Sequence, residues 1–158
     1  MRICGLQKLT LLDYPGHTAC TVFTGGCNYR CPFCHNAELV LRSGEQPGIP
    51  EEEFFALLDK RKGLLDGVAV TGGEPTLQPD LPDFLRRVRE KGYDVKLDTN
   101  GTRPEVLKAL VREGLVQYAA MDVKNSPARY AETAGVEDPE PDRVWESADF
   151  LLSGPIPY

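Results

Sequence analysis

Short apolar runs alternate with longer segments of helical period along the chain. Apolar and β-branched residues fill four such runs, and each run is followed within two residues by a glycine or an asparagine. These runs span residues 18–23, 67–71, 94–98 and 118–123. Runs of this length that end at turn-forming residues predict strands. An earlier segment, residues 3–12, predicts an additional edge strand or hairpin.

Helical patterns occupy the intervals between these runs. Pro50 followed by three glutamates suits a helix N-terminus, because proline fixes φ and negative charge complements the helix dipole. From Leu81, apolar residues repeat at i, i+3, i+4 and i+7, which is the period of an amphipathic helix. Thr102 and Glu105 have the spacing of a capping box before a third helix. A fourth helix is predicted over residues 144–151.

The order of these elements predicts the fold class. Strands that alternate with helices form a parallel sheet with right-handed crossovers, so we expect an α/β protein. The interval from residue 23 to residue 67 is too long for a simple crossover and contains three clustered cysteines. We therefore expect that interval to carry a special loop.

Composition and charge narrow the function classes. The chain has 158 residues, of which 41% are hydrophobic and 27% charged, which is typical of a folded globular domain and too short for a complete eight-stranded barrel. Its net charge of −6 argues against a general binder of nucleic acid or of membrane surfaces. Neither a leader segment nor a membrane-spanning apolar run is present, so we expect a cytoplasmic protein.

A cysteine triplet follows the first of the four runs. Cys27, Cys31 and Cys34 have the spacing Cys-x-x-x-Cys-x-x-Cys. Three thiolates on one short loop can hold three corners of a cubane iron–sulfur cluster and leave one iron open, whereas an electron-transfer cluster takes four protein ligands. The odd total of five cysteines argues against a disulfide framework.

Two other interpretations of the triplet remain open. Structural zinc takes four ligands, and His35 is a candidate fourth. However, His35 adjoins Cys34, and Cys4 and Cys20 are too isolated to form a second zinc knuckle. Three unrelated core cysteines are the other alternative, and the tight spacing argues against it. The pattern favours a cluster.

The motifs resemble those of a known family. The cysteine spacing, with the aromatic Phe33 just before the last cysteine, resembles the radical S-adenosylmethionine (SAM) superfamily. Residues 26–36 resemble the glycyl-radical-enzyme activases within it. Residues 11–16, Leu-Leu-Asp-Tyr-Pro-Gly, resemble the start of the activating protein of anaerobic ribonucleoside-triphosphate reductase. The resemblance covers essentially the whole chain.

The resemblance implies a fold and its extent. The family has a partial (β/α) barrel of six parallel strands, and this chain offers about four βα units. Residues 1–158 would then be a single radical SAM domain that is C-terminally incomplete. Without two further strands, the strand at 118–123 is expected to keep an unpaired edge.

The resemblance also implies a chemistry. Cys27, Cys31 and Cys34 would hold a [4Fe-4S] cluster that cleaves SAM to methionine and a 5′-deoxyadenosyl radical. That radical would take a hydrogen atom from a glycine of a partner, a glycyl radical enzyme, for which the resemblance favours anaerobic ribonucleotide reductase. An electron donor such as flavodoxin or ferredoxin is implied. The alternatives are an activase of a formate-lyase-type enzyme, another radical SAM reaction, and a non-enzymatic zinc or iron–sulfur module.

Further candidate residues follow the other predicted strands. Gly72, Gly73 and Glu74 suit either a tight turn or, by resemblance, the loop that holds the SAM amino group. Asp98 and Asn100 suit either an Asn-Gly turn with a solvated acid or, by resemblance, a loop that faces SAM.

The last loop and the cysteine loop supply the remaining candidates. Asp122 and Lys124 suit a salt bridge at a strand end or, by resemblance, a Lys124 that pairs with the SAM carboxylate and an Asp122 that orients it. Phe33 suits a core aromatic or, by resemblance, a contact with the SAM adenine. His35 is expected at the rim of the cluster, and Cys20 is expected to have no chemical role.

These loops share one position relative to the strands. Each follows the carboxyl end of a predicted parallel strand, and those ends meet at one edge of a parallel sheet, where ligand sites form. We therefore expect the loops to build one site.

Overall fold

The computed structural model describes residues 1–158 as an α/β fold built on one five-stranded sheet. The strands are β1 (Ile3–Thr10), β2 (Ala19–Thr24), β3 (Gly67–Gly72), β4 (Asp94–Thr99) and β5 (Tyr118–Met121). The α-helices are α1 (Ala37–Leu41), α2 (Glu51–Lys60), α3 (Leu81–Glu90), α4 (Pro104–Arg112), α5 (Tyr130–Ala134) and α6 (Pro141–Leu152). Two short 3₁₀ helices are η1 (Pro75–Leu77) and η2 (Pro127–Arg129).

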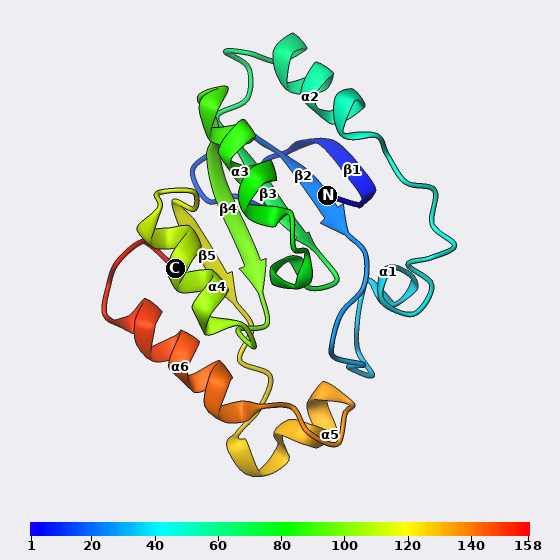
Figure 1. Ribbon diagram of the computed structural model, residues 1–158, viewed down its shortest axis with the longest axis vertical. Coiled ribbons are helices and arrows are strands. Elements are labelled where there is room, and N and C mark those ends of the chain that lie inside the picture. The colour runs from blue at the N-terminus through cyan, green and yellow to red at the C-terminus, as the bar shows by residue number, and fades with distance from the viewer.

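The strands lie in chain order across the sheet. β2, β3, β4 and β5 are parallel neighbours, and β1 pairs with β2 in the antiparallel sense. The four predicted parallel strands are confirmed, and residues 3–12 contain the predicted additional edge strand, β1. The sheet stays open. Figure 1 shows the arrowheads of β2 to β5 pointing to the same end of the sheet, toward α1 and α5.

The long interval after β2 holds the cysteine loop, which we define as residues 25–36, followed by α1 and α2. The expectation that something other than a simple crossover fills this interval is confirmed. The connections that follow β3 and β4 are single crossovers through α3 and α4. Each of those crossovers returns the chain to the start of the next strand. The carboxyl ends of β2 to β5, which precede the candidate site loops, therefore lie at the same edge of the sheet.

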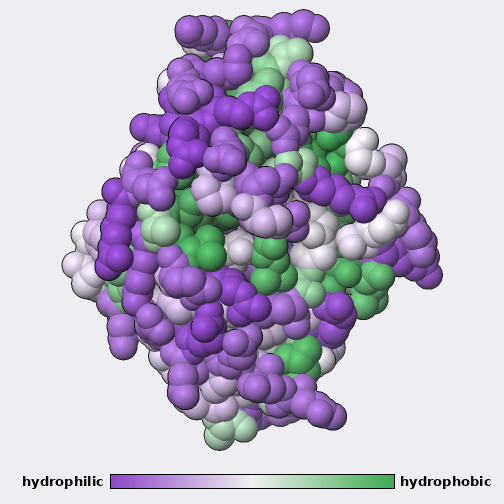
Figure 2. All heavy atoms as spheres, in the orientation of Figure 1, coloured by the Kyte–Doolittle hydropathy of each residue, from purple (hydrophilic) through white to green (hydrophobic).

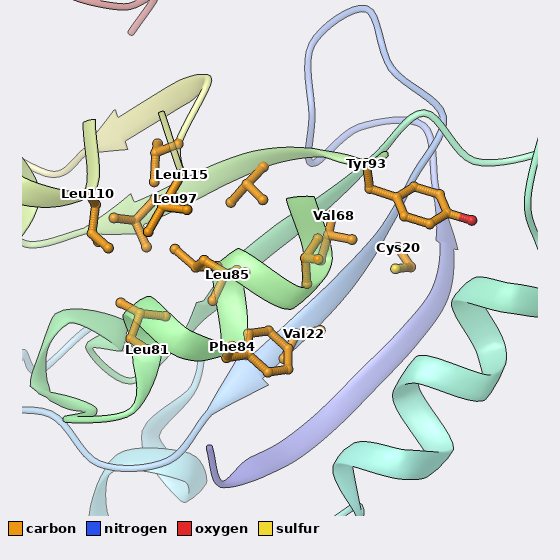
Figure 3. Packing of buried hydrophobic residues seen from close by; sticks show 14 of the residues in the cluster. Cys20, Val22, Val68, Leu81, Phe84, Leu85, Tyr93, Leu97, Leu110 and Leu115 are labelled. Carbon is orange, nitrogen blue, oxygen red and sulfur yellow. The ribbon is translucent and has the colours of Figure 1, made fainter. Parts of the chain in front are cut away.

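Alternate strand residues form the core on one face of the sheet. The parallel register places Val68 of β3 between Cys20 of β2 and Val95 of β4, and all three are fully buried. Phe84 and Leu85 of α3 pack onto this layer, as Figure 3 shows. The burial of such side chains provides about 25 cal/mol per Å² of apolar surface, which makes this face the main source of stability.

The opposite positions of the same strands carry small and polar side chains. Thr21, Ala69, Thr71, Lys96 and Asp98 occupy them, because successive side chains of a strand point to opposite faces. Lys96 is buried and pairs with Asp98 two residues further along β4.

One local prediction from the sequence is wrong. The capping box of Thr102 and Glu105 does not form, because α4 begins at Pro104 and its N-cap residue, Arg103, makes no side-chain capping hydrogen bond. The hydroxyl of Thr102 instead donates to Oδ1 of Asn100 at 2.8 Å. Proline at the first helical position supplies the fixed φ that starts a helix without a cap.

The edge of β5 is paired at one position. The backbone N–H of Ala119 donates to the carbonyl oxygen of Pro157 at 3.1 Å, so the chain near Pro157 reaches the edge that was expected to be unpaired. The face shown in Figure 2 is mainly hydrophilic, with hydrophobic residues in small separate areas. No helix of the structure is long and apolar enough to cross a membrane.

Candidate active site

A cavity of about 450 Å³ lies where the parallel strands end. All twelve candidate site residues that the sequence singled out line it. They are Cys27, Cys31, Phe33, Cys34, His35, Gly72, Gly73, Glu74, Asp98, Asn100, Asp122 and Lys124. The walls also include Tyr29, Asn36, Val40, Thr71, Thr99 and Val123, which sequence reasoning missed. Four loops that are distant in sequence therefore meet at one place.

Contacts on both sides hold the cysteine loop in position. The N–H of Gly26 donates to the carbonyl of Leu39 at 2.8 Å, and the N–H of Arg30 donates to the carbonyl of Ala134 at 2.8 Å. The buried Tyr29 ring packs edge-on against Tyr130, and its hydroxyl donates to the carbonyl of Pro139 at 2.6 Å. The segment after β5 therefore supports the loop from one side and α1 from the other.

The three thiols of the loop face the same cavity and are partly buried. Burial raises the pKa of both Cys27 and Cys31, and the charge of Lys124 partly offsets this effect at Cys31. No group of three or more Cys, His, Asp or Glu side chains converges in metal-binding geometry, and His35 lies exposed at the rim. The donor set nevertheless fits an iron–sulfur cluster, because thiolates of one loop are the ligands that such clusters use.

Gly72 and Gly73 allow the end of β3 and the loop after it to pack closely against β2 and the cysteine loop. Gly72 has a φ of +117°, and a Cβ on it would lie 2.3 Å from the backbone nitrogen of Thr24. A Cβ on Gly73 would lie 1.8 Å from the carbonyl oxygen of Gly26. The N–H of Glu74 donates to that same oxygen at 2.8 Å. A side chain at Gly72 would therefore push β3 away from the end of β2, and one at Gly73 would separate the two loops.

The carboxylate of Glu74 is engaged within the protein. Its Oε1 accepts hydrogen bonds from the N–H of Thr76 at 3.1 Å and from the hydroxyls of Thr76 and Thr99 at 2.5 and 2.8 Å. Its Oε2 accepts from the N–H of Asn100 at 2.7 Å. Glu74 is only 1% exposed, and burial raises its pKa against the opposing effect of these donors. Glu74 thus ties the loop after β3 to the loop after β4.

Asp98 is paired rather than solvated. The Nζ of Lys96 donates to Oδ1 of Asp98. Burial raises the pKa of Asp98, and the hydrogen bond from Lys96 opposes that rise. The interpretation of Asp98 as a freely solvated acid in an Asn-Gly turn is therefore wrong, because the polar face of β4 supplies a cation beside it. The sequence signal for this pair is the i, i+2 spacing, which places both residues on one face of a strand.

Lys124 and Asp122 form an ion pair with a distance of 2.6 Å from Nζ to Oδ2. Burial acts to lower the pKa of Lys124, but the hydrogen bond and charge of Asp122 outweigh it and the pKa is raised. The Nζ lies 5.9 Å from the ring centroid of Phe33. Phe33 is 57% exposed at the cavity, so the interpretation of Phe33 as a core aromatic is wrong.

Asn36 is a site residue that sequence reasoning missed. Its Nδ2 donates to the carbonyl oxygen of Gly72 at 3.2 Å, so it links the end of the cysteine loop to the loop after β3. The sequence feature that could have identified Asn36 is its position directly after Cys34 and His35.

Cys20, by contrast, lies outside the site. It is fully buried in the core shown in Figure 3, and burial raises its pKa to about 12.

A family model and several known proteins match this chain. The family model described as "Radical SAM superfamily" matches residues 21–154. A protein of Methanocaldococcus jannaschii that is named as a glycyl-radical enzyme activating enzyme is 40% identical over 131 residues, which cover 82% of this chain and 53% of that protein. The pyruvate formate-lyase-activating enzyme of Clostridium pasteurianum is 35% identical over 105 residues, which cover 63% of this chain and 43% of that enzyme.

Relatives with other reactions also match. A GTP 3′,8-cyclase of Thermococcus kodakarensis is 34% identical over 117 residues, covering 72% of this chain and 37% of that protein. The crystal structure of QueE from Escherichia coli has a TM-score of 0.57 at 17% identity and covers 97% of this chain and 77% of that one, which shows a shared fold. The chain spans about half the length, or less, of the curated relatives it matches.

Proposed function

The chain belongs to the radical SAM superfamily, and on that basis we propose that it cleaves SAM reductively and generates a glycyl radical on a partner enzyme. The observation that carries the proposal is the meeting of three thiols, a backbone loop rich in glycine and a paired lysine around one cavity. Relatives named for glycyl-radical activation and for activation of pyruvate formate-lyase support this reaction over the others.

Cys27, Cys31 and Cys34 are the proposed ligands of a [4Fe-4S] cluster. When bound, the cluster supplies the electron that breaks the bond between sulfur and C5′ of SAM, which yields methionine and the 5′-deoxyadenosyl radical. The protein contributes a fixed loop and a partly buried setting for the three thiols. Burial raises the pKa of Cys27 and Cys31, a cost that ligation of iron by the two thiolates would offset.

The remaining wall residues are the proposed SAM contacts. Lys124 provides a compact positive charge for the carboxylate, with Asp122 holding its ammonium group in place. The carbonyl groups of Gly72 and Gly73 are the proposed acceptors for the amino group, since the carboxylate of Glu74 already accepts four hydrogen bonds. Asp98 lines the same wall, and the exposed ring of Phe33 offers an apolar surface for the adenine.

The proposed partner is a glycyl radical enzyme, and the sequence of residues 11–16 favours anaerobic ribonucleotide reductase among such enzymes. A flavodoxin or a ferredoxin is the proposed electron donor. Phe33 and Val123 expose apolar surface at the cavity, which suits a mouth that a partner segment covers. Such a cover would exclude water from the radical.

A small-molecule radical SAM reaction is the second candidate. It is favoured by the match to the GTP 3′,8-cyclase of Thermococcus kodakarensis, which is 34% identical over 117 residues. The cluster and SAM loops are compatible with both candidates, so only the acceptor of the radical distinguishes them.

Anaerobic assays test both parts of the proposal. Reconstituted protein incubated with SAM and a strong reductant should release 5′-deoxyadenosine, and the Cys31→Ala variant should release none. Addition of anaerobic ribonucleotide reductase should give the electron paramagnetic resonance doublet of a glycyl radical. The same assay is repeated with a formate-lyase-type enzyme. Release of 5′-deoxyadenosine without a glycyl radical on either enzyme would favour the small-molecule reaction. Absence of both iron and SAM cleavage would overturn the proposal.

A further inference from the structure

Three buried or half-buried polar side chains form a closed ring of hydrogen bonds beside Cys27. Nδ2 of Asn100 donates to Oδ1 of Asn28 at 2.8 Å, and Nδ2 of Asn28 donates to Oγ1 of Thr102 at 3.0 Å. Oγ1 of Thr102 then donates to Oδ1 of Asn100 at 2.8 Å. The ring joins the cysteine loop to the loop after β4, which lies more than seventy residues away in the sequence.

The ring fixes which way the amide of Asn100 faces. Its Oδ1 accepts from the hydroxyl of Thr102 and also from the backbone N–H of Thr102 at 3.0 Å. If the Asn100 amide were flipped, its NH₂ group would face the backbone N–H of Thr102. That N–H would then have no acceptor. Thr102 is fully buried and Asn100 nearly so, so no water replaces a lost partner at low cost.

One N–H of Asn100 is left over by the ring, and it is directed at a thiol. One hydrogen of the Asn100 NH₂ group bonds to Oδ1 of Asn28. The second faces Sγ of Cys27, which lies 3.8 Å from Nδ2 of Asn100. The backbone N–H of Tyr29 also donates to this sulfur, at 3.3 Å. No side chain donates a hydrogen bond to the sulfur of Cys31 or Cys34. The three cysteines proposed as ligands therefore differ in the hydrogen-bond donors around their sulfur atoms.

We propose that Asn100 is a positioning residue whose second N–H donates to the Cys27 thiolate and so raises the reduction potential of the cluster. The inference rests on the proposed function, because it concerns a cluster held by Cys27. Reduction increases the negative charge on the ligand sulfurs, and an N–H dipole aimed at one of them stabilises the reduced form more than the oxidised form. Thr102 and Asn28 serve to hold that N–H in place.

The test is a redox titration of the reconstituted cluster, followed by electron paramagnetic resonance. Asn100→Leu keeps the approximate shape of the side chain but removes the donor without adding a charge, so its midpoint potential should shift to more negative values. Asn125→Leu is the matched control, because Asn125 bonds to Thr133 and to no sulfur, and its potential should equal that of the wild type. Equal potentials for all three proteins would overturn the inference.

A second pair of variants covers the case in which Asn100→Leu does not fold. Thr102→Val removes the hydroxyl that orients Asn100 and should shift the potential in the same direction, whereas Thr102→Ser keeps the hydroxyl and should restore the wild-type value. If Val and Ser give the same potential, the inference is wrong. Iron and sulfide content separates the two levels of failure: a wild-type protein without a cluster contradicts the proposed function itself, while clusters of unchanged potential contradict only the role of Asn100.

Discussion

The backbone N–H of Asn100 donates a 2.7 Å hydrogen bond to Oε2 of Glu74 and thereby fastens the loop after β4 to the loop after β3. Glu74 also donates its own N–H to the carbonyl of Gly26 in the cysteine loop. One residue therefore connects three of the four loops around the cavity. Because its carboxylate is buried and has four donors, any change there is expected to act on the whole site.

Glu74→Gln should lower the free energy of unfolding by about 1–3 kcal/mol, because the amide NH₂ would face a donor on one side or the other. The measurement is chemical denaturation monitored by circular dichroism. Glu45→Gln is the matched control, since Glu45 is exposed and makes no ion pair, and it should change stability by less than about 0.5 kcal/mol. Equal stability of the two variants would show that the four donors tolerate an amide.

Gly73→Ala should destabilise the protein by about 1–3 kcal/mol or more, because its Cβ would lie 1.8 Å from the backbone oxygen of Gly26 and neither loop can yield easily. Gly44→Ala is the control. A Cβ there meets nothing within 4 Å, and loss of unfolded-chain entropy should leave stability unchanged or slightly raised. Thermal denaturation compares the two, and a Gly73→Ala variant as stable as the control would contradict the close packing of the loops.

Cys31→Ala should abolish the cluster and all cleavage of SAM, since two thiolates do not hold a cubane securely. Cys20→Ala should keep both, at a cost of about 1–2 kcal/mol in stability from the small cavity it leaves in the core. Iron and acid-labile sulfide, measured after anaerobic reconstitution, distinguish the variants. The reverse pattern, with iron lost from the Cys20 variant and kept in the Cys31 variant, would refute the ligand assignment.

Lys124→Ala should weaken SAM binding by roughly 1.5–3 kcal/mol, the usual size of a charge-assisted hydrogen bond, which corresponds to roughly 10- to 150-fold in Kd. The cluster content should stay unchanged. Anaerobic calorimetry measures the affinity, and Lys60→Ala at the exposed end of α2 should bind SAM as the wild type does. An unchanged affinity for the Lys124 variant would reduce its role to the ion pair with Asp122.

The sequence by itself determined the order of the elements and the loops that carry chemistry. The strands β2 to β5 follow from runs of apolar residues bounded by glycine and asparagine, and their parallel arrangement follows from the alternation with helices. Because parallel strands share one direction, the loops after them had to meet at one edge. That is why the sequence alone predicts a shared site for Cys27, Gly73, Asp98 and Lys124, all of which line the same cavity.

Only the tertiary structure decided how each side chain is used. Glu74 looked free to bind a ligand but turns into the protein, and Thr102 looked like a helix cap but holds Asn100. Nothing in the sequence predicted the hydrogen bond between Asn28 and Asn100, because the two residues lie 72 positions apart. A hydrogen bond depends on distance and angle to within a few tenths of an ångström, and that precision arises only when packing has fixed the loops against one another.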